Sequence, residues 1–383
     1  MVIKNARLFL KKEIIKGDLV IHNGRIAGIG HEGSKLSDGE QEVVDAEGAF
    51  AIPGLIDIHF HGAVNCDFSR GDVKELAKIA EYEAKNGVLA ICPATMTYSE
   101  DILKNAMTAA REFQPLSIED PDKADLVGIN MEGPFISPNR LGAQNPLYLK
   151  SPDPEMFRRL QKAAGGLIKI LDMAPELSGA MECIDELKDE VRISLAHTEA
   201  SYELACEAFS RGMKHVTHLY NAMPKMNHRE PGPIRAAMES DVTAELISDG
   251  VHNHPAMVRM AFEAFKDRII LISDSMEAAG LPDGVFDLGG QEVKVDRGRA
   301  VLLRDPGVIA GSVVNLFVAM KTAITHAKVP FREAVEAATI NPARAIGIDR
   351  DYGSLEPGKI ANIVLMDDDI NIKRVISRGV EIS

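Results

Sequence analysis

Two histidines stand two residues apart at the end of an apolar run, in the segment Leu55-Ile56-Asp57-Ile58-His59-Phe60-His61. Side chains two residues apart on a strand point to the same side, so the imidazoles of His59 and His61 would face one site. Burying either ring without a partner would cost about 1 to 3 kcal/mol. A single core histidine is commonly satisfied by a neighbour, so the pair alone does not decide between packing and metal binding.

Metal-compatible side chains also end several later apolar runs. They are Glu132, His197, His218, His252 and Asp274. Five of the 11 histidines therefore lie at the ends of predicted strands, together with two carboxylates. Imidazole and carboxylate groups together bind zinc, iron, cobalt or manganese, and such an ion can lower the pKa of bound water toward neutrality. The cluster predicts a metal site that activates water.

Eight apolar runs would position these side chains. They cover residues 55–61, 87–97, 126–132, 167–173, 192–197, 215–219, 243–248 and 269–273. The amphipathic stretches around them predict helices over residues 72–85, 100–113, 153–164, 178–190, 199–211, 233–240 and 255–266. This alternation predicts an α/β fold, a TIM-like (β/α)8 barrel with its site at the C-terminal ends of the strands. The alternative, an open doubly wound sheet, would carry a Gly-rich phosphate motif after the first strand, where the sequence has none.

Short β-like runs and turns fill both ends of the chain, with Asn23-Gly24 as a hairpin signal. Neither end is apolar enough to form a stable sheet alone. We therefore expect residues 1–52 and 347–383 to build one small β-sandwich domain, and residues 53–346 to form the barrel. Within the barrel segment, a Gly-rich, hairpin-like insertion over residues 280–304 is followed by predicted helices over residues 313–326 and 331–345.

Net charge and cysteine content indicate which partners and which kinds of site are not expected. The net charge of −14 disfavours nucleic acid and anionic membranes as partners. The four cysteines form no CxxC pair, so neither a thiolate zinc site nor a disulfide framework is indicated. The first residues lack the regions of a signal peptide, and no apolar run approaches the length of a membrane span. We expect a cytoplasmic protein.

The opening motif, Pro53 to Gly62, resembles that of the amidohydrolase superfamily. Later motifs extend the resemblance to the deacetylase family that acts on N-acetylglucosamine 6-phosphate. They are Glu132-Gly133-Pro134-Phe135, Gly142-Ala143-Gln144-Asn145-Pro146, Ala196-His197-Thr198, Thr217-His218-Leu219-Tyr220-Asn221-Ala222-Met223, Ser248-Asp249-Gly250-Val251-His252 and Ser273-Asp274-Ser275-Met276. The resemblance continues in order to Gly353-Ser354-Leu355-Glu356-Pro357-Gly358.

This resemblance implies one or two divalent metal ions per subunit, with zinc favoured and iron, cobalt or manganese open. The implied ligands of one ion are Glu132, His197 and His218. Those of the second are His59, His61 and Asp274, with Glu132 shared between the two.

The implied reaction is hydrolytic deacetylation of N-acetyl-D-glucosamine 6-phosphate by metal-activated water, in amino-sugar catabolism. Asp274 resembles the general base, and His252 resembles the group that polarises the acetamido carbonyl. The implied substrate-binding residues are Ala143, Gln144, Asn221, Ala222, Arg229, His252, Ile309, Ala310 and Gly311. Arg229 matches a phosphate-reading arginine, in its own subunit or in a neighbour's site within a homodimer. Some family members carry histidine where this chain has Gln144, so Gln144 is expected to bind substrate and not to catalyse.

Two alternatives stay open. The substrate could be N-acetylgalactosamine 6-phosphate or another N-acyl amino-sugar phosphate, because contacts in loops decide between epimers. The chain could also be a catalytically silent barrel scaffold, since the fold alone hosts many functions.

Overall fold

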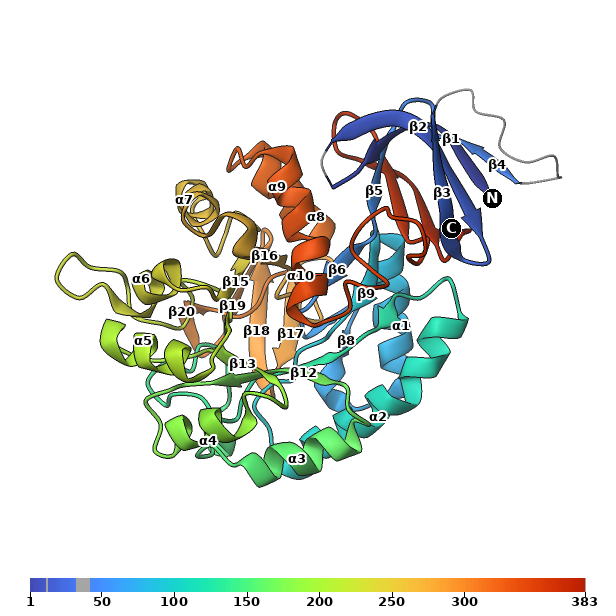
Figure 1. Cartoon of the computed structure of the whole chain (residues 1–383). Helices are drawn as coiled ribbons and strands as arrows, with labels where there is room; N and C mark the ends of the chain where they lie inside the picture. The colour runs from blue at the N-terminus through green and yellow to red at the C-terminus, as the bar shows by residue number, and fades with distance from the viewer. Residues whose placement is uncertain (12, 32–41, 383) are drawn as a thin grey trace.

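The computed structural model describes residues 1–11, 13–31 and 42–382. Figure 1 shows strands surrounded by helices, with a further sheet built from both chain ends at one side, where the two termini lie. No helix among the described residues combines the length and the apolar character needed to cross a membrane.

Nine strands carry the eight predicted apolar runs, and their parallel pairing agrees with the predicted α/β class. A six-stranded parallel sheet has the order β11-β12-β13-β14-β15-β16, and a three-stranded parallel sheet has the order β10-β9-β6. Their bounds are β6 (Leu55–Asp57), β9 (Val88–Ile91), β10 (Asp125–Leu126), β11 (Ile129–Met131), β12 (Ile168–Met173), β13 (Arg192–Leu195), β14 (His215–Val216), β15 (Thr243–Ile247) and β16 (Ile269–Ile272).

The third predicted run is split, and this split joins the two sheets. β10 pairs with β9, whereas β11 pairs with β12. Between them, Val127 N donates to Ile91 O at 2.9 Å and Ile129 N donates to Leu167 O at 2.8 Å. Adjoining residues of one run therefore bond to strands on either side.

A different contact joins the last strand to the first. β16 and β6 share no ladder within the described residues, but Asp274 N donates to His59 O at 2.9 Å. β6 ends at Asp57, so both histidines of the opening motif lie beyond the strand that was predicted to hold them. The backbone bond nevertheless brings the end of the first run to the end of the eighth.

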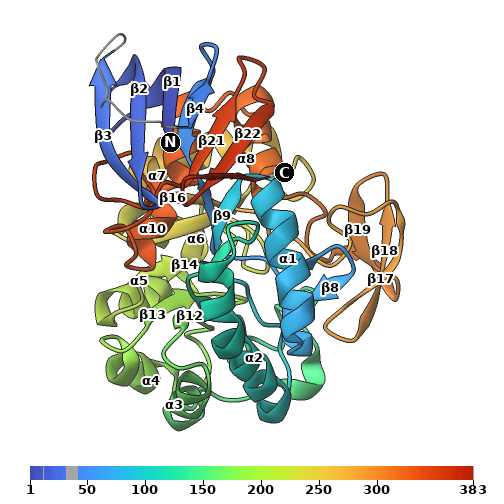
Figure 2. The same ribbon diagram turned by 90° about the vertical axis from the view of Figure 1, so that its right-hand side faces the viewer.

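Helices follow most of the strands and cover them from outside (Figures 1 and 2). They are α1 (Val73–Lys85), α2 (Glu100–Glu119), α3 (Pro154–Ala163), α4 (Ala180–Leu187), α5 (Tyr202–Arg211), α6 (Gly232–Glu239), α7 (Pro255–Phe265), α8 (Leu316–Thr325), α9 (Phe331–Ala337) and α10 (Ile340–Ala345), with short 3-10 turns at Phe68–Arg70, Pro146–Tyr148 and Lys266–Arg268. Side chains such as those of Asp72 and Ser201 cap their first turns. The helix predicted over residues 331–345 is broken at Thr339, whose φ of −134° and ψ of −82° are not helical.

Successive side chains of a strand point to opposite faces, and in the parallel strands these two faces belong to two different buried clusters. In β16, Ile269 and Leu271 belong to the large cluster that includes the helices, whereas Ile270 and Ile272 belong to a cluster with Ile247 of β15. A side chain two residues beyond Ile272 continues the second set if the alternation holds. That position is occupied by Asp274.

The two chain ends pair in one eight-stranded sheet of order β23-β22-β21-β5-β1-β2-β3, in which β4 also pairs with β1. Its strands are β1 (Val2–Phe9), β2 (Ile14–His22), β3 (Arg25–His31), β4 (Val43–Asp45), β5 (Phe50–Pro53), β21 (Ile363–Met366), β22 (Ile372–Ser377) and β23 (Val380–Ile382). The predicted turn joins β2 to β3, with φ of 48° at Asn23 and 71° at Gly24.

The segment after β16 is larger than the predicted hairpin. It forms a four-stranded antiparallel sheet of β17 (Gly284–Leu288), β18 (Gln291–Asp296), β19 (Arg299–Leu302) and β20 (Asp305–Ile309). Figure 2 shows this sheet projecting at the right-hand side, away from the helices. A smaller hairpin, β7 (Gly62–Ala63) and β8 (Cys66–Asp67), follows the opening motif.

Candidate active site

Six predicted metal ligands meet at the ends of five different strands. They form two groups, His59, His61 and Asp274, and Glu132, His197 and His218. Within each group the candidate ligand atoms lie within 4.8 Å of one another, and all six side chains are buried. Each group therefore offers three donors of the kinds that divalent transition metals accept.

Glu132 lies between the two groups. Its Oε1 is 3.0 Å from His197 Nε2 and 3.1 Å from His218 Nε2. The same carboxylate reaches the other group, with Oε2 3.3 Å from His61 Nε2 and Oε1 3.6 Å from His59 Nε2. This is the position that a shared carboxylate would occupy.

Hydrogen bonds on the far side of the rings aim three Nε2 atoms at the carboxylates. His59 Nδ1 lies 2.8 Å from Glu245 Oε2, His61 Nδ1 lies 3.3 Å from the carbonyl oxygen of Ala94, and His197 Nδ1 lies 2.7 Å from that of Arg140. Among the described residues, the buried Nε2 of His59 has no hydrogen-bond partner. A buried ring nitrogen without a hydrogen-bond partner fits a metal ligand better than a packing residue.

The backbone is unusual at three of these positions. His197, His218 and Asp274 have φ values of 42°, 29° and 49°, and each stands two residues after the end of its strand. A non-glycine residue in this region costs on the order of 1 to 3 kcal/mol, and such residues cluster at functional sites. These three positions lie beyond the ends of β13, β14 and β16, and their side chains belong to the two ligand groups.

Charges at the site are mutually stabilised. Burial alone would raise the pKa of Glu132 and of Asp274, but the neighbouring histidines outweigh it and hold both pKa values below their usual range. Burial would likewise lower the pKa of His59 and His61, yet the surrounding carboxylates raise both. The carboxylates are therefore ionised and attract positive charge into this buried place, as protons on imidazole or as a cation.

A cavity of about 250 Å³ opens on the two groups. Seven of the predicted substrate-binding residues line it, namely Ala143, Gln144, Asn221, Ala222, His252, Ile309 and Gly311. Ala310 is fully buried and does not line the cavity. Gly311 has a φ of 67°, and a Cβ there would lie 3.2 Å from the carbonyl oxygen of Asp274, so glycine suits this close approach.

Gln144 contacts the predicted metal site directly. Its Nε2 donates to Glu132 Oε2 at 2.6 Å, while its Oε1 accepts from Thr97 N at 2.7 Å. The amide is thus oriented by the backbone and supports the central carboxylate. Sequence reasoning assigned Gln144 to the substrate alone and did not predict this contact.

His252 is held by a carboxylate that sequence reasoning left without a role. His252 Nδ1 lies 2.7 Å from Asp249 Oδ2, and the Asp249 Oδ1 accepts from the backbone N–H of His252 at 2.9 Å. Burial lowers the pKa of His252, but Asp249 outweighs it and raises the pKa above its usual value. With Nδ1–H committed to Asp249, the protonated ring presents Nε2–H as a donor.

Apolar residues of the cavity were also missed. Met96, Leu288 and Val308 line it, the last two from the four-stranded insertion. Side chains of this type are common in any core, so their composition carried no signal of a site.

Arg229 stands apart from the cavity within this chain. It lies on an exposed loop, where its Nη1 is 2.7 Å from His228 Nε2 and its backbone N–H donates to Asn227 Oδ1 at 3.0 Å. No carboxylate pairs with its guanidinium among the residues described.

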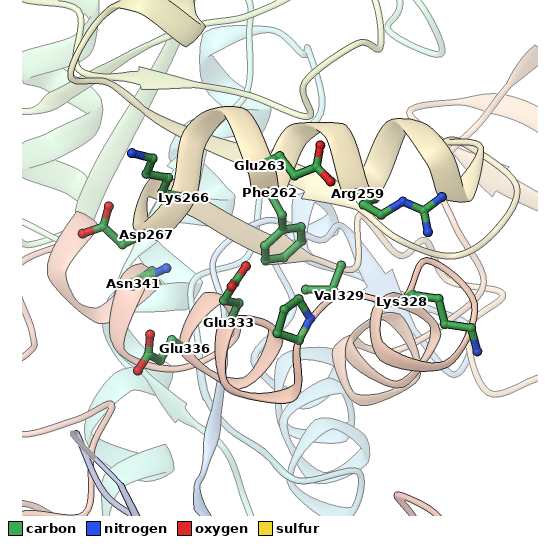
Figure 3. A pocket seen from close by; sticks show the side chains of 11 residues that line it. Arg259, Phe262, Glu263, Lys266, Asp267, Lys328, Val329, Glu333, Glu336 and Asn341 are labelled. Atoms are coloured by element: carbon green, nitrogen blue, oxygen red, sulfur yellow. The ribbon is translucent and has the colours of Figure 1, made fainter.

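A larger cavity of about 520 Å³ lies elsewhere, between α7 and the start of α9 (Figure 3). Its floor includes Phe262 and Val329, and charged groups of both signs surround it, such as Arg259 and Glu333. None of the predicted site residues lines it. Because predicted ligands and acid–base residues line the smaller cavity, we take that cavity as the candidate active site.

Comparison with known proteins shows the family of this chain. The model of the amidohydrolase family matches residues 50–382. An N-acetylglucosamine-6-phosphate deacetylase of Bacillus subtilis (strain 168) is 36% identical, over 99% of this chain and 96% of the relative. An N-acetylgalactosamine-6-phosphate deacetylase of Escherichia coli O157:H7 is 32% identical, over 88% of this chain and 89% of the relative.

A solved structure extends the similarity to the whole fold. A mutant N-acetyl-D-glucosamine-6-phosphate deacetylase from Mycobacterium smegmatis, in complex with N-acetyl-D-glucosamine-6-phosphate, superposes with a TM-score of 0.92. The two chains share 29% identity, and the match covers 100% of this chain and 98% of the other. The resemblance inferred from the sequence is confirmed, and this chain belongs to the amidohydrolase family.

Proposed function

We propose that this protein is a metal-dependent deacetylase that hydrolyses N-acetyl-D-glucosamine 6-phosphate to D-glucosamine 6-phosphate and acetate, in amino-sugar catabolism. The observation that carries the proposal is the placement of Glu132 between two three-residue groups at the floor of one cavity. The relatives named above supply the substrate class. The convergence of all six side chains argues against a silent scaffold.

One or two divalent ions would be held by these side chains, with zinc favoured by the imidazole and carboxylate donors. Glu132, His197 and His218 would hold one ion, and His59, His61 and Asp274 the other, with Glu132 shared. When bound, a divalent ion acts as a Lewis acid that makes water nucleophilic near neutral pH and polarises a carbonyl oxygen.

The chain's own residues move the protons. Asp274 is ionised and faces the cavity, so it can accept a proton from the attacking water. The protonated acid then gives that proton to the departing amine, which makes C–N cleavage possible. His252, held by Asp249, donates its Nε2–H to the acetamido oxygen as negative charge develops there.

We propose that the sugar is held by the cavity residues Ala143, Gln144, Asn221, Ala222, Ile309 and Gly311, with Ala310 supporting that wall from behind. Arg229 would bind the 6-phosphate, in its own subunit or in the partner's site of a homodimer. A planar guanidinium matches a phosphate with two parallel hydrogen bonds.

Replacing that arginine tests the phosphate contact. Charged hydrogen bonds contribute about 1.5 to 3 kcal/mol, so Arg229→Gln should lower kcat/KM for the phosphorylated sugar roughly 10- to 100-fold. The loss should appear mainly in KM. Arg235→Gln is the control, because Arg235 is an exposed arginine of α6 paired with Glu239. Equal kinetics of the Arg229 and Arg235 variants would contradict the phosphate role.

The pH profile tests the pairing of His252 with Asp249. The imidazolium is lost as pH rises through its raised pKa. In Asp249→Asn, the hydrogen bond and charge that raise this pKa are removed, while burial still lowers it. The basic limb of kcat/KM against pH should therefore move to lower pH. An unchanged basic limb would show that Asp249 does not tune His252.

The second candidate substrate is the epimer N-acetyl-D-galactosamine 6-phosphate. It is suggested by the similarity to the Escherichia coli N-acetylgalactosamine-6-phosphate deacetylase. Acetate release from N-acetyl-D-glucosamine 6-phosphate and N-acetyl-D-galactosamine 6-phosphate should be compared as kcat/KM. We expect the glucosamine substrate to be faster. A higher value for the galactosamine epimer would replace the proposed substrate, and no turnover of either would remove the proposed function.

We also propose a closed (β/α)8 barrel over residues 53–346 and a small β-sandwich from residues 1–52 and 347–383. The split third run and the bond from Asp274 N to His59 O support closure. The homodimer and the cytoplasmic location stay predictions from the sequence.

A further inference from the structure

A buried carboxylate outside the six predicted ligands lies directly behind the site. Glu245 is in β15, between Ala244 and Leu246, and its side chain is fully buried. Its register partner on β16, Ile270, belongs to the buried cluster that also contains Ile247 and Ile272. A charge in such surroundings is costly unless it is paired and hydrogen-bonded.

Three donors surround this carboxylate. Glu245 Oε2 lies 2.8 Å from His59 Nδ1 and accepts from the backbone N–H of His218 at 3.2 Å. Glu245 Oε1 lies 3.0 Å from His215 Nε2. His215 Nδ1 in turn lies 2.6 Å from Thr243 Oγ1. One carboxylate thus contacts residues from both predicted metal groups.

The hydrogen positions along this chain follow from what each atom can donate. A carboxylate only accepts, so His59 Nδ1 and His215 Nε2 must both carry hydrogens. His215 Nδ1 is then free to accept from the Thr243 hydroxyl. In the neutral ring that binds a metal, the lone pair is then on His59 Nε2, which lies 3.6 Å from Glu132 Oε1 and 3.7 Å from Asp274 Oδ1. The tautomer that a metal requires is the one this arrangement selects.

The hydrogen-bond partner of His59 Nδ1 differs from the partners of the corresponding nitrogens in His61 and His197. His61 and His197 are held by backbone carbonyls, Ala94 O and Arg140 O. A carboxylate partner makes a charge-assisted bond and raises the basicity of the ligating nitrogen more than a carbonyl does. Asn130 Nδ2 also approaches His59 Nδ1, but at 3.4 Å, a longer contact than the one to Glu245.

We propose that Glu245 is a positioning residue, which holds His59 with Nε2 facing Asp274 and Glu132 and so sets the metal affinity of the group His59, His61 and Asp274. The inference rests on the proposed function for its relevance to catalysis. Its direct consequence concerns metal binding alone.

Zinc titration of the metal-free protein tests this role. Glu245→Gln keeps the size of the side chain but removes the charge that accepts from both rings. Loss of an outer partner typically weakens metal binding about 10- to 100-fold. We expect one zinc site to weaken by that factor while the site of Glu132, His197 and His218 keeps its affinity. Because a weaker ligand stabilises the folded state less, zinc should also increase the Tm of the variant by less than it increases the Tm of the wild type.

A second variant, Glu245→Asp, tests the same role in case Glu245→Gln folds poorly. Glu245→Asp retains the negative charge but withdraws the carboxylate by one methylene, so it should also weaken the same zinc site. The absorption bands of cobalt(II) in that site should change with either variant, which mere loss of stability would not cause.

Glu83→Gln is the matched control. Glu83 is another fully buried glutamate, it contacts none of the predicted ligands, and burial raises its pKa well above the usual range, so an amide mimics the neutral acid. It should bind zinc like the wild type. Unchanged zinc affinity in both Glu245 variants would overturn the proposal. A wild type that binds zinc but releases no acetate would contradict the proposed function and leave the zinc result standing.

Discussion

Asp274→Asn should lower kcat by about 10² to 10⁴-fold, the range that a positioned general base contributes. Asparagine has the same size but cannot accept the proton of the attacking water or return it to the amine. The backbone should tolerate the change, because asparagine adopts a positive φ such as the 49° of Asp274 more readily than most residues. The measurement is steady-state acetate release, with KM and metal content determined on the same protein.

Asp172→Asn is the control for burial and amide substitution. Asp172 is also fully buried, on β12, but its carboxylate accepts from Thr217 Oγ1 at 2.9 Å and contacts none of the six predicted ligands. It should keep most of its activity. If Asp274→Asn retained its metal and turned over at the rate of this control, Asp274 would not be the base.

Glu132→Gln should have the second large effect, loss of metal from both groups. Glutamine offers one neutral oxygen where the carboxylate now lies within 3.6 Å of four imidazole nitrogens. Losing Lewis-acid activation removes several kcal/mol of transition-state stabilisation, which corresponds to roughly a 10³-fold or greater loss of kcat/KM. Elemental analysis beside the acetate assay measures both consequences.

The matched control is Glu176→Gln. Glu176 lies near the same end of the strands, where it accepts from Thr198 Oγ1 at 2.5 Å, but it does not line the cavity. It should keep its metal and most of its activity. Full metal occupancy in Glu132→Gln would contradict the central position given to Glu132.

The site was predictable where side-chain chemistry coincided with strand ends. His197, His218 and Asp274 each stand two residues after a strand, and periodicity locates the end of a short apolar run well. His59 was predicted for the same reason, although β6 ends at Asp57, four residues before the end of the predicted run 55–61. Parallel strands bring such ends together whatever their separation in the chain.

Contacts between residues that are distant in the sequence could not be predicted from local patterns. Glu245 and His59 are 186 residues apart, and nothing in the sequence around Glu245 marks it as the partner of an imidazole. Gln144 and Glu132 meet because a loop folds back over the cavity, and the lining residues Leu288 and Val308 come from an insertion with the composition of ordinary strands. The split of the third run depends on which neighbour each backbone group bonds to, and periodicity does not encode that choice.

Acetate release from N-acetyl-D-glucosamine 6-phosphate by the purified wild-type protein is the direct test of the proposed deacetylase activity. The zinc-loaded protein should release one acetate and one D-glucosamine 6-phosphate per substrate consumed. Turnover should disappear when a chelator removes the metal and return when zinc is added back. A zinc-loaded, folded protein that leaves the substrate intact would contradict the proposed metal-dependent activity, as would full turnover by protein shown by elemental analysis to be free of metal.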